Sequence, residues 1–226
     1  MRFSLFTLLG ILLSTSLSAQ LNLKVGYHYA ATDPTVNNKI IDQINSNNSS
    51  LEDYNEMESI RSFNGINFGT RYRAGYVGLN LDWTPKFQAV EFDGTNPTTN
   101  TNEFRKLYYR HNTYSVGLEF FIKKFSLGAS YDWNRLRIQS ENTDRTDRHI
   151  IFKSNSTSSH FFVGLNIYGN EFLTIALQPY IQIPWSNFNL TNLENDLNTG
   201  VNLNSYEDEF MTYGLRIVLQ NGYYEK

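Results

Sequence analysis

The chain contains no cysteine among its 226 residues. This absence excludes disulfides, thiolate metal sites and the lipidated cysteine that follows the signal of a lipoprotein. Charged residues make up only 18% of the chain, and the formal net charge of -3 comes with no basic stripe, so no nucleic-acid partner is expected. The mean hydropathy of -0.43 excludes a bundle of membrane-spanning helices. Packing without covalent cross-links must therefore hold the fold together.

The one long hydrophobic run lies at the N-terminus, from Phe3 to Leu13. It follows a single basic residue, Arg2, and precedes the small-residue stretch Ser14–Ala19. This order is typical of a cleaved secretory signal peptide, and the run is too short to be a transmembrane helix, which needs roughly 20 apolar residues. We predict a signal peptide over residues 1–19 and one mature domain over residues 20–226. Loss of Arg2 would change the formal net charge from -3 by one unit to -4.

The mature chain is rich in aromatic residues, with 15 Tyr, 16 Phe and 3 Trp. Its apolar residues alternate with small or polar ones at period two, which indicates strands rather than helices. The alternating runs cover residues 21–30, 65–72, 77–84, 114–120, 125–134, 160–167, 173–183 and 211–219.

The connections between these runs alternate in length. Long connections at one end and tight turns at the other are typical of an outer-membrane barrel, and an even strand count returns both termini to the same side. We therefore predict an all-β fold, a closed antiparallel up-and-down transmembrane β-barrel of about eight strands. The long connections are 33–61, 93–103, 139–149 and 186–208, and the tight turns lie near 73–75, 122–124 and 169–171.

Two details accompany this prediction. The first long connection is expected to contain a short helix over Lys39–Ile44, followed by a mobile Asn/Ser-rich stretch, Asn45–Ser50. Pro179 lies inside the seventh run and Pro184 near its end, yet a closed barrel has no edge strand on which a missing N–H is harmless. We expect a bulge or bend there, close to the outer rim.

Alternation alone does not say which face is outside, because a soluble lipocalin-like calyx also alternates, with its apolar face inward. The other face of these runs is rich in Gly, Ser, Asn and Ala, which suits a crowded lumen better than a water-facing surface. Five aromatic residues lie on the apolar face seven or eight residues from the tight turns, and we expect them to form an outer aromatic girdle. They are Tyr29, Trp83, Tyr114, Trp133 and Phe161.

The last run ends in a pattern typical of outer-membrane barrels. Thr212 is followed by Gly214, and Ile217 and Leu219 lie three and five residues after that glycine. With the signal peptide and the loop alternation, the mature chain resembles the small eight-stranded outer-membrane barrels of the OmpA/OmpX type. The resemblance covers nearly the whole mature chain at the level of architecture, and it implies insertion by the barrel-assembly machinery. The tail 220–226 departs from the family, whose members usually end near an aromatic residue.

Charged residues also fall on the face opposite the apolar one, and their charges balance. A barrel of about eight strands is just wide enough for side chains to fill, so these charges are expected to pair as a structural plug rather than to form an ion gate. Glu119 and Arg71 lie close to tight turns, and Glu119 is expected to pair with Arg71 or Arg216. The predicted lumen charge network comprises Lys24, Arg71, Asp82, Glu119, Asp132 and Arg216.

Motifs for catalysis are scarce. The sequence contains no phosphate loop, nucleophile elbow or zinc motif, so neither a cofactor nor a metal is expected. Barrel hydrolases of lipid A resemble this architecture and use a His-x-Ser pair; the nearest match, His111-Asn112-Thr113, has Thr in place of Ser. A histidine at the rim of the barrel is favoured, because a lone His near a hydroxyl is common and a dyad also needs an orienting acid. The acidic stretches 52–58 and 207–209 are expected to be solvated loops, with divalent-cation binding beside lipopolysaccharide as the alternative.

These observations favour a non-enzymatic outer-membrane barrel that acts in envelope integrity or surface binding through its external loops. Its expected partners are outer-membrane lipids and lipopolysaccharide, besides the barrel-assembly machinery; the surface ligand is not identified. Two other classes stay open. One is a membrane-embedded lipid A hydrolase or acyltransferase, and the other is a soluble lipocalin-like lipid carrier.

Overall fold

The computed structural model describes residues 20–168 and 173–221. The predicted signal peptide, the turn near 169–171 and the tail after Asn221 lie outside the described residues. The strands that build the barrel are β1 (Gln20–Thr32), β3 (Ser62–Ala74), β4 (Val77–Thr95), β5 (Asn102–Ile122), β6 (Phe125–Asn142), β7 (His149–Tyr168), β8 (Leu173–Pro184) and β11 (Thr212–Asn221).

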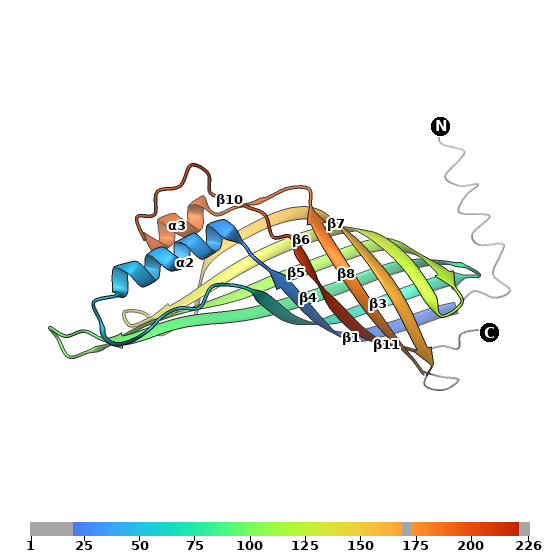
Figure 1. The fold of residues 1–226 in the computed structure, drawn as a ribbon, viewed down its shortest axis with the longest axis horizontal. Helices are drawn as coiled ribbons and strands as arrows, with labels where there is room; N and C mark the ends of the chain where they lie inside the picture. The colour runs from blue at the N-terminus through green and yellow to red at the C-terminus, as the bar shows by residue number, and fades with distance from the viewer. Residues whose placement is uncertain (1–19, 169–172, 222–226) are drawn as a thin grey trace.

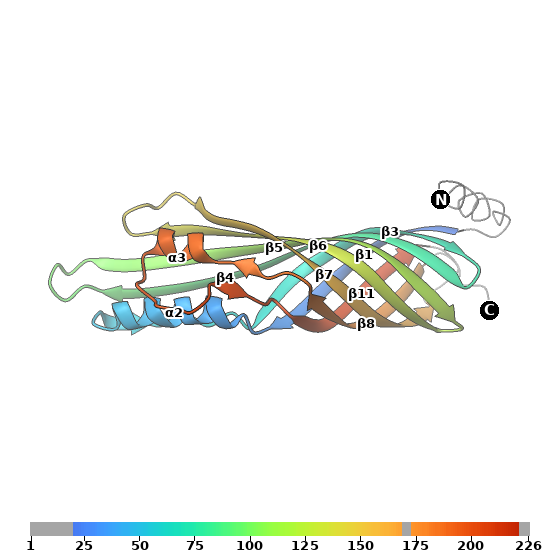
Figure 2. The ribbon, with the colours of Figure 1, turned by 90° about the horizontal axis from the view of Figure 1, so that it is seen from above.

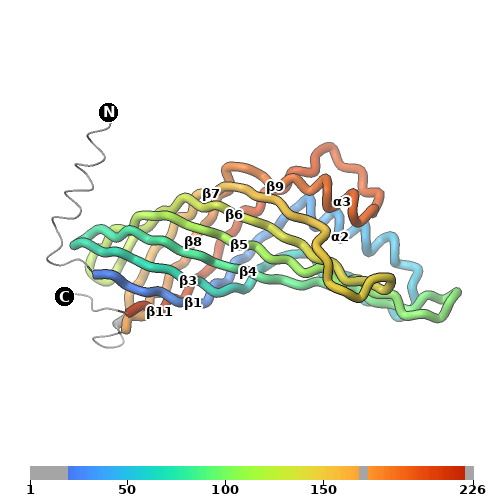
Figure 3. Tube along the Cα trace, turned by 180° about the vertical axis from the view of Figure 1, so that it is seen from behind, coloured from blue at the N-terminus to red at the C-terminus, as the bar shows by residue number. Residues whose placement is uncertain are grey.

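These eight strands form one closed antiparallel ring (Figure 1). Each strand pairs with the next barrel strand along the chain, and β11 pairs with β1, for example at Lys24 and Gln220. The predicted up-and-down barrel of about eight strands is therefore confirmed. The strands cross the barrel at a slant (Figure 3), as closure of a ring of this size requires. We call the end with the short β3–β4 and β5–β6 turns the turn end.

The outward face of the ring is apolar and the lumen is polar. Side chains such as Leu21 (65% exposed), Leu118 (48%) and Leu127 (51%) point away from the barrel, whereas Asn80 (4%) and Gln178 (4%) are buried inside it. A soluble calyx has the opposite arrangement, so the lipocalin-like alternative is wrong and the barrel is of the transmembrane type. In the described segments, no helix is long and apolar enough to cross a membrane.

Strands β4 to β7 extend well beyond the ring at the end opposite the turns (Figures 1 and 2). The predicted loops 93–103 and 139–149 are therefore shorter than expected, since β4 pairs with β5 as far as Thr95 and Asn102, and β6 runs to Asn142. The alternation continues along these strands, but here the inward-facing residues become apolar. Leu107 and Tyr109 are buried on the inner face of β5, beyond the level where the lumen is polar.

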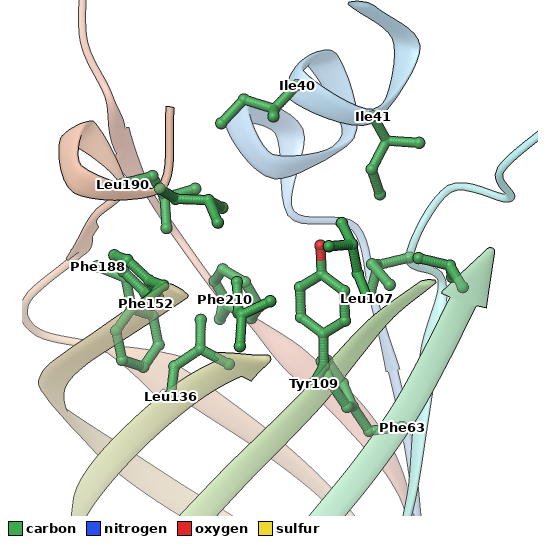
Figure 4. Close-up of a cluster of buried hydrophobic side chains, with 14 of the residues drawn as sticks. Ile40, Ile41, Phe63, Leu107, Tyr109, Leu136, Phe152, Phe188, Leu190 and Phe210 are labelled. Carbon is green, nitrogen blue, oxygen red and sulfur yellow. The ribbon is translucent and has the colours of Figure 1, made fainter. Parts of the chain in front are cut away.

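The other two long connections pack against this extension, and the first also pairs with the edge of β4. The first contains α2 (Thr35–Asn48) and β2 (Glu52–Asn55), and the second contains β9 (Phe188–Asn189), α3 (Thr191–Leu197) and β10 (Glu207–Asp208). We call these segments and the extended strands together the cap. Its buried core includes Ile40, Ile41, Ile44, Met57, Phe63, Leu107, Tyr109, Leu136, Ile138, Phe152, Phe188, Leu190, Leu193 and Phe210 (Figure 4).

The helix α2 is longer than the predicted Lys39–Ile44, and it includes part of the stretch that was predicted to be mobile. Residues 45–48 form its last turn. Asn45 Oδ1 accepts the backbone N–H of Met57 at 2.9 Å and the hydroxyl of Tyr54 at 2.8 Å. Asn and Ser are held here by tertiary hydrogen bonds, which composition does not reveal.

The bulge expected at the prolines is absent from the described strand β8. Pro179 pairs with Leu215 on β11, and the β7–β8 register is the same on both sides of it, at Phe162 with Tyr180 and at Leu165 with Leu177. Pro179 therefore interrupts the ladder with β7 without shifting it. Pro184 ends the strand.

Candidate functional site

The lumen near the turn end is filled by charged and amide side chains. Lys24 Nζ lies 2.7 Å from Asp82 Oδ1 and donates to Asn80 Oδ1 at 2.8 Å. Asn80 Nδ2 in turn donates to Glu119 Oε2 at 3.1 Å. The side chains of Lys24 and Asp82 are each only 6% exposed, so each charge is compensated by the other rather than by water.

Arg71 is the cation that reaches Glu119. Its Nη1 lies 3.5 Å from Glu119 Oε2, and its Nε and Nη2 donate to Asn22 Oδ1 at 3.3 and 3.2 Å. The guanidinium carbon lies 4.8 Å from the centre of the Phe121 ring. Of the two partners considered for Glu119, the structure places Arg71 beside it and not Arg216.

Arg216 is placed against aromatic rings instead. Its guanidinium carbon lies 4.8 Å from the centre of the Phe162 ring and 6.0 Å from that of Tyr180. Phe162 points into the lumen because Gly128 opposite it leaves the room: a Cβ at Gly128 would lie 2.1 Å from Phe162 Cζ. The Tyr180 hydroxyl lies 2.6 Å from Nε2 of His28. Among the ion pairs of the described residues, none involves Arg216.

Asp132 belongs to a second network, nearer the cap. Gln182 Nε2 donates to Asp132 Oδ2 at 3.0 Å, and Lys86 Nζ donates to Gln182 Oε1 at 3.2 Å. His160 Nδ1 lies 3.6 Å from Asp132 Oδ2, and the hydroxyl of Ser130 donates to Oδ1 at 2.7 Å. An amide thus joins the buried anion to the lysine.

Lys86 is the lumen cation that the sequence interpretation missed. Its side chain is 1% exposed, but the predicted third run ended at Thr84. The signal was present, because even-numbered residues of β4 face inward from Asp82 onward. Extending that parity by one step would have placed Lys86 in the lumen.

The cap closes the other end of the lumen with aromatic rings. The ring centres of Phe63, Phe188 and Phe210 lie 5.9, 5.8 and 6.3 Å from that of His111, in edge-to-face geometry. Figure 4 shows Phe63, Phe188 and Phe210 under the helices of the cap. His111 therefore lies at the boundary between the polar lumen and the apolar core.

The position of His111 and Thr113 also determines whether they can act on a lipid. Both contact Asn134 Oδ1, His111 through Nε2 at 3.3 Å and Thr113 through its hydroxyl at 3.0 Å. They are 1% and 4% exposed and face inward. A lipid on the outward face of the barrel cannot reach them, so a lipid hydrolase built on this pair is not supported. The described residues also contain no group of three or more His, Cys, Asp or Glu that could hold a metal ion.

The five predicted girdle residues all lie on the outward face. Trp83, Tyr114 and Trp133 are direct neighbours across β4, β5 and β6, with exposed fractions of 38%, 48% and 49%. Tyr29 and Phe161 are exposed on β1 and β7, at other register positions.

The architecture is similar to that of known barrel structures. One is Ail, the attachment invasion locus protein of Yersinia pestis, in complex with the heparin analogue sucrose octasulfate, with 9% identity and a TM-score of 0.48 over 91% of this chain and 98% of that one. Neisserial surface protein A follows with 7% identity and a TM-score of 0.47, over 91% and 99%. The outer membrane protease OmpT from Escherichia coli has 9% identity and a TM-score of 0.40, over 93% and 100%.

No family model and no curated protein matches the chain. The likenesses therefore concern the fold alone, and they carry no activity or ligand over to this protein. The resemblance to small outer-membrane barrels is confirmed at the level of architecture.

Asp208 connects the two long connecting segments within the cap. Its Oδ2 accepts the backbone N–H of Asn37, in the first turn of α2, at 2.7 Å. The Asn37 side chain accepts the Tyr109 hydroxyl at 3.1 Å. Asp208 is 2% exposed, so the solvated loop expected at 207–209 is wrong for this residue. Burial raises the pKa of Asp208 to about 6, although backbone hydrogen bonds oppose that change.

The cap should consequently be more stable at acidic than at neutral pH. The folded-state pKa of about 6 lies above the ordinary 3.8, so between these values the closed cap binds more protons than the opened one. Its stability is fully present at about pH 4 and falls as the pH rises through about 6, by at most about 3 kcal/mol. Protection factors of the α2 amides, corrected for intrinsic exchange, should be lower at about pH 7.5 than at about pH 5. Asp208→Asn should remove the difference, whereas equal wild-type protection at both pH values would contradict the raised pKa.

The Arg71–Glu119 pair makes a second prediction. Glu119→Ala leaves Arg71 without its buried carboxylate, which typically costs about 3–5 kcal/mol in the free energy of unfolding. Urea titration should show a lower unfolding midpoint for this variant. Adding Arg71→Leu should recover part of the loss, because the uncompensated charge is then removed. Adding Arg216→Leu instead should be additive; recovery with Arg216→Leu and none with Arg71→Leu would show the pairing to be wrong.

Proposed function

We propose that the protein is a non-enzymatic outer-membrane barrel with a closed lumen, and that it acts at the cell surface as a binding protein through its cap. The observation that carries the proposal is the cap itself. Two external segments and four extended strands share one buried core, so the exposed residues of α2, α3 and the hairpins stand on a rigid support. A mere membrane anchor has no need of such a platform, whereas a binding surface gains from being pre-organised.

Localisation in the outer membrane is part of this proposal. Support comes from the apolar outward face, from the N-terminal segment with its signal-peptide pattern, and from the C-terminal pattern Thr212–Leu219, which lies on β11. Strand β11 closes the ring against β1. Export through a cleaved signal and insertion by the barrel-assembly machinery fit these features.

The cap should lie outside the cell. Single cysteines at Asn47, Thr99 and Asn195, all exposed at the cap end, should react with a membrane-impermeant maleimide on intact cells. A cysteine at Lys123, exposed in the β5–β6 turn, should react only after the outer membrane is permeabilised. The reverse pattern would invert the topology, and recovery of the wild type in a soluble fraction would end the membrane proposal.

The lumen should not conduct ions. Support comes from the two polar networks and from the aromatic rings under the cap, which occupy the lumen at successive levels. Planar-bilayer recordings of the purified protein should show no steady current, and deleting residues 187–207 should open at most a brief, small one, because the lumen networks remain. A large and stable wild-type current would establish a porin-like pore in place of the closed barrel.

A further inference from the structure

The outward face of β5, β6 and β7 changes character in regular steps toward the cap. The strand registers place its residues in rows that run across the three strands, and successive rows are two residues, or about 7 Å, apart along a strand. From the middle of the apolar belt toward the cap, the rows are Leu118–Ala129–Phe161, Val116–Tyr131–Ser159, Tyr114–Trp133–Thr157, Asn112–Arg135–Asn155 and Arg110–Arg137–Lys153.

The apolar part of this face is hollowed. Ala129 is the small residue in its row, and a groove passes over it between Leu118, Phe161 and Trp185. A second groove, lined by Trp133, Arg135 and Thr157 among others, continues toward the cap. The two hollows share the β6–β7 surface, one inside the apolar belt and one at its edge.

The two rows nearest the cap carry positive charges that have no ion-pair partner among the described residues. Arg110, Arg137 and Lys153 are direct cross-strand neighbours, although like charges placed opposite each other destabilise a sheet. Arg135 lies one row below them. Among the described residues none of these four cations makes an ion pair, whereas Lys106 further out pairs with Glu91. An anion from outside the chain would remove the repulsion.

The position of the cations indicates where that anion comes from. Arg135 lies about 7 Å beyond Trp133 along β6, and Arg137 about 14 Å beyond it. Aromatic girdles mark the boundary of the hydrocarbon, and the headgroup layer extends only some 5–8 Å above it along the membrane normal. On strands tilted by about 40°, the row of Arg135 lies about 5 Å above Trp133 along the membrane normal, within this layer, and the row of Arg137 lies about 11 Å above it, at the outer margin of the layer that holds the lipid phosphates.

We propose that this face binds a phosphorylated, multiply acylated lipid of the outer leaflet, with the chemistry of lipid A. Its phosphates lie at Arg135, Arg110, Arg137 and Lys153, and one acyl chain lies in the groove over Ala129. The proposal rests on the outer-membrane location argued above. It does not depend on the surface ligand, whose binding is proposed for the exposed residues of α2, α3 and the hairpins.

The test is a lipid titration of the mature chain folded in uncharged detergent micelles. Hexa-acylated, bis-phosphorylated lipid A with brominated chains should quench the tryptophan fluorescence saturably, since Trp133 and Trp185 line the two grooves. Arg135→Gln/Arg137→Gln should weaken binding tenfold or more, the loss expected for charge-assisted hydrogen bonds. Ala129→Leu, which fills the groove, should weaken lipid A binding as well.

The matched control is Lys106→Gln/Arg148→Gln. It removes the same charge farther from the apolar belt, where Lys106 on β5 pairs with Glu91, and Arg148, just before β7, stacks on Tyr108, 3.5 Å from the ring centre. Lipid A binding should stay within twofold of wild type. The affinity of wild type for dephosphorylated lipid A should be no higher than the affinity of Arg135→Gln/Arg137→Gln for intact lipid A.

Three results would overturn the proposal. An equal loss in the control variant would reduce the effect to overall charge. If wild type bound dephosphorylated lipid A as tightly as intact lipid A, the phosphate contacts would be refuted. If heparin bound at these arginines and lipid A did not, the face would be a site for a soluble polyanion. None of these results would affect the maleimide topology or the closed lumen, so the proposed function could stand without this site.

Discussion

Closure of the ring is the constraint on which the rest of the structure depends. In lipid every backbone N–H and C=O must find a partner within the protein, and a sheet satisfies this only if its first and last strands pair. Here β1 and β11 do so over nine residue pairs, from Lys24 with Gln220 to Thr32 with Thr212. Closure then creates an interior that lipid cannot enter, and the protein has to fill that interior with its own side chains.

The side chains that fill the lumen differ in chemistry from one level of the barrel to the next. Near the turn end, charges pair directly, as Lys24 does with Asp82. Further in, Gln182 joins Asp132 to Lys86, which spreads one negative charge over several donors. At the cap end, rings replace charges around His111. Toward the cap, the packing of the barrel interior therefore changes from ionic to apolar.

The membrane part of the fold could be predicted from sequence because lipid imposes one simple rule, apolar outward at every second residue. The rule placed the strands, the turns and the lumen face of Asp82 and Glu119. It failed where lipid ends. On β5 the inner side chains become apolar at Leu107 and Tyr109, so the alternation continues with apolar residues inward, and the predicted run began only at Tyr114. The core role of Phe188 and Phe210, and the burial of Asp208, depend on contacts between segments far apart in the chain, which no local pattern encodes.

The cap core has a consequence for the order of assembly. It joins a segment that follows the first barrel strand, 33–61, to one that precedes the last, 185–211, and Asp208 reaches across to α2. Neither segment can complete its packing until both are in place and strand β11 has reached β1. The cap core therefore stabilises the pairing of β1 with β11, which closes the barrel. Once this core has formed, separating β1 from β11 requires disrupting the packing of the cap as well as a row of backbone hydrogen bonds.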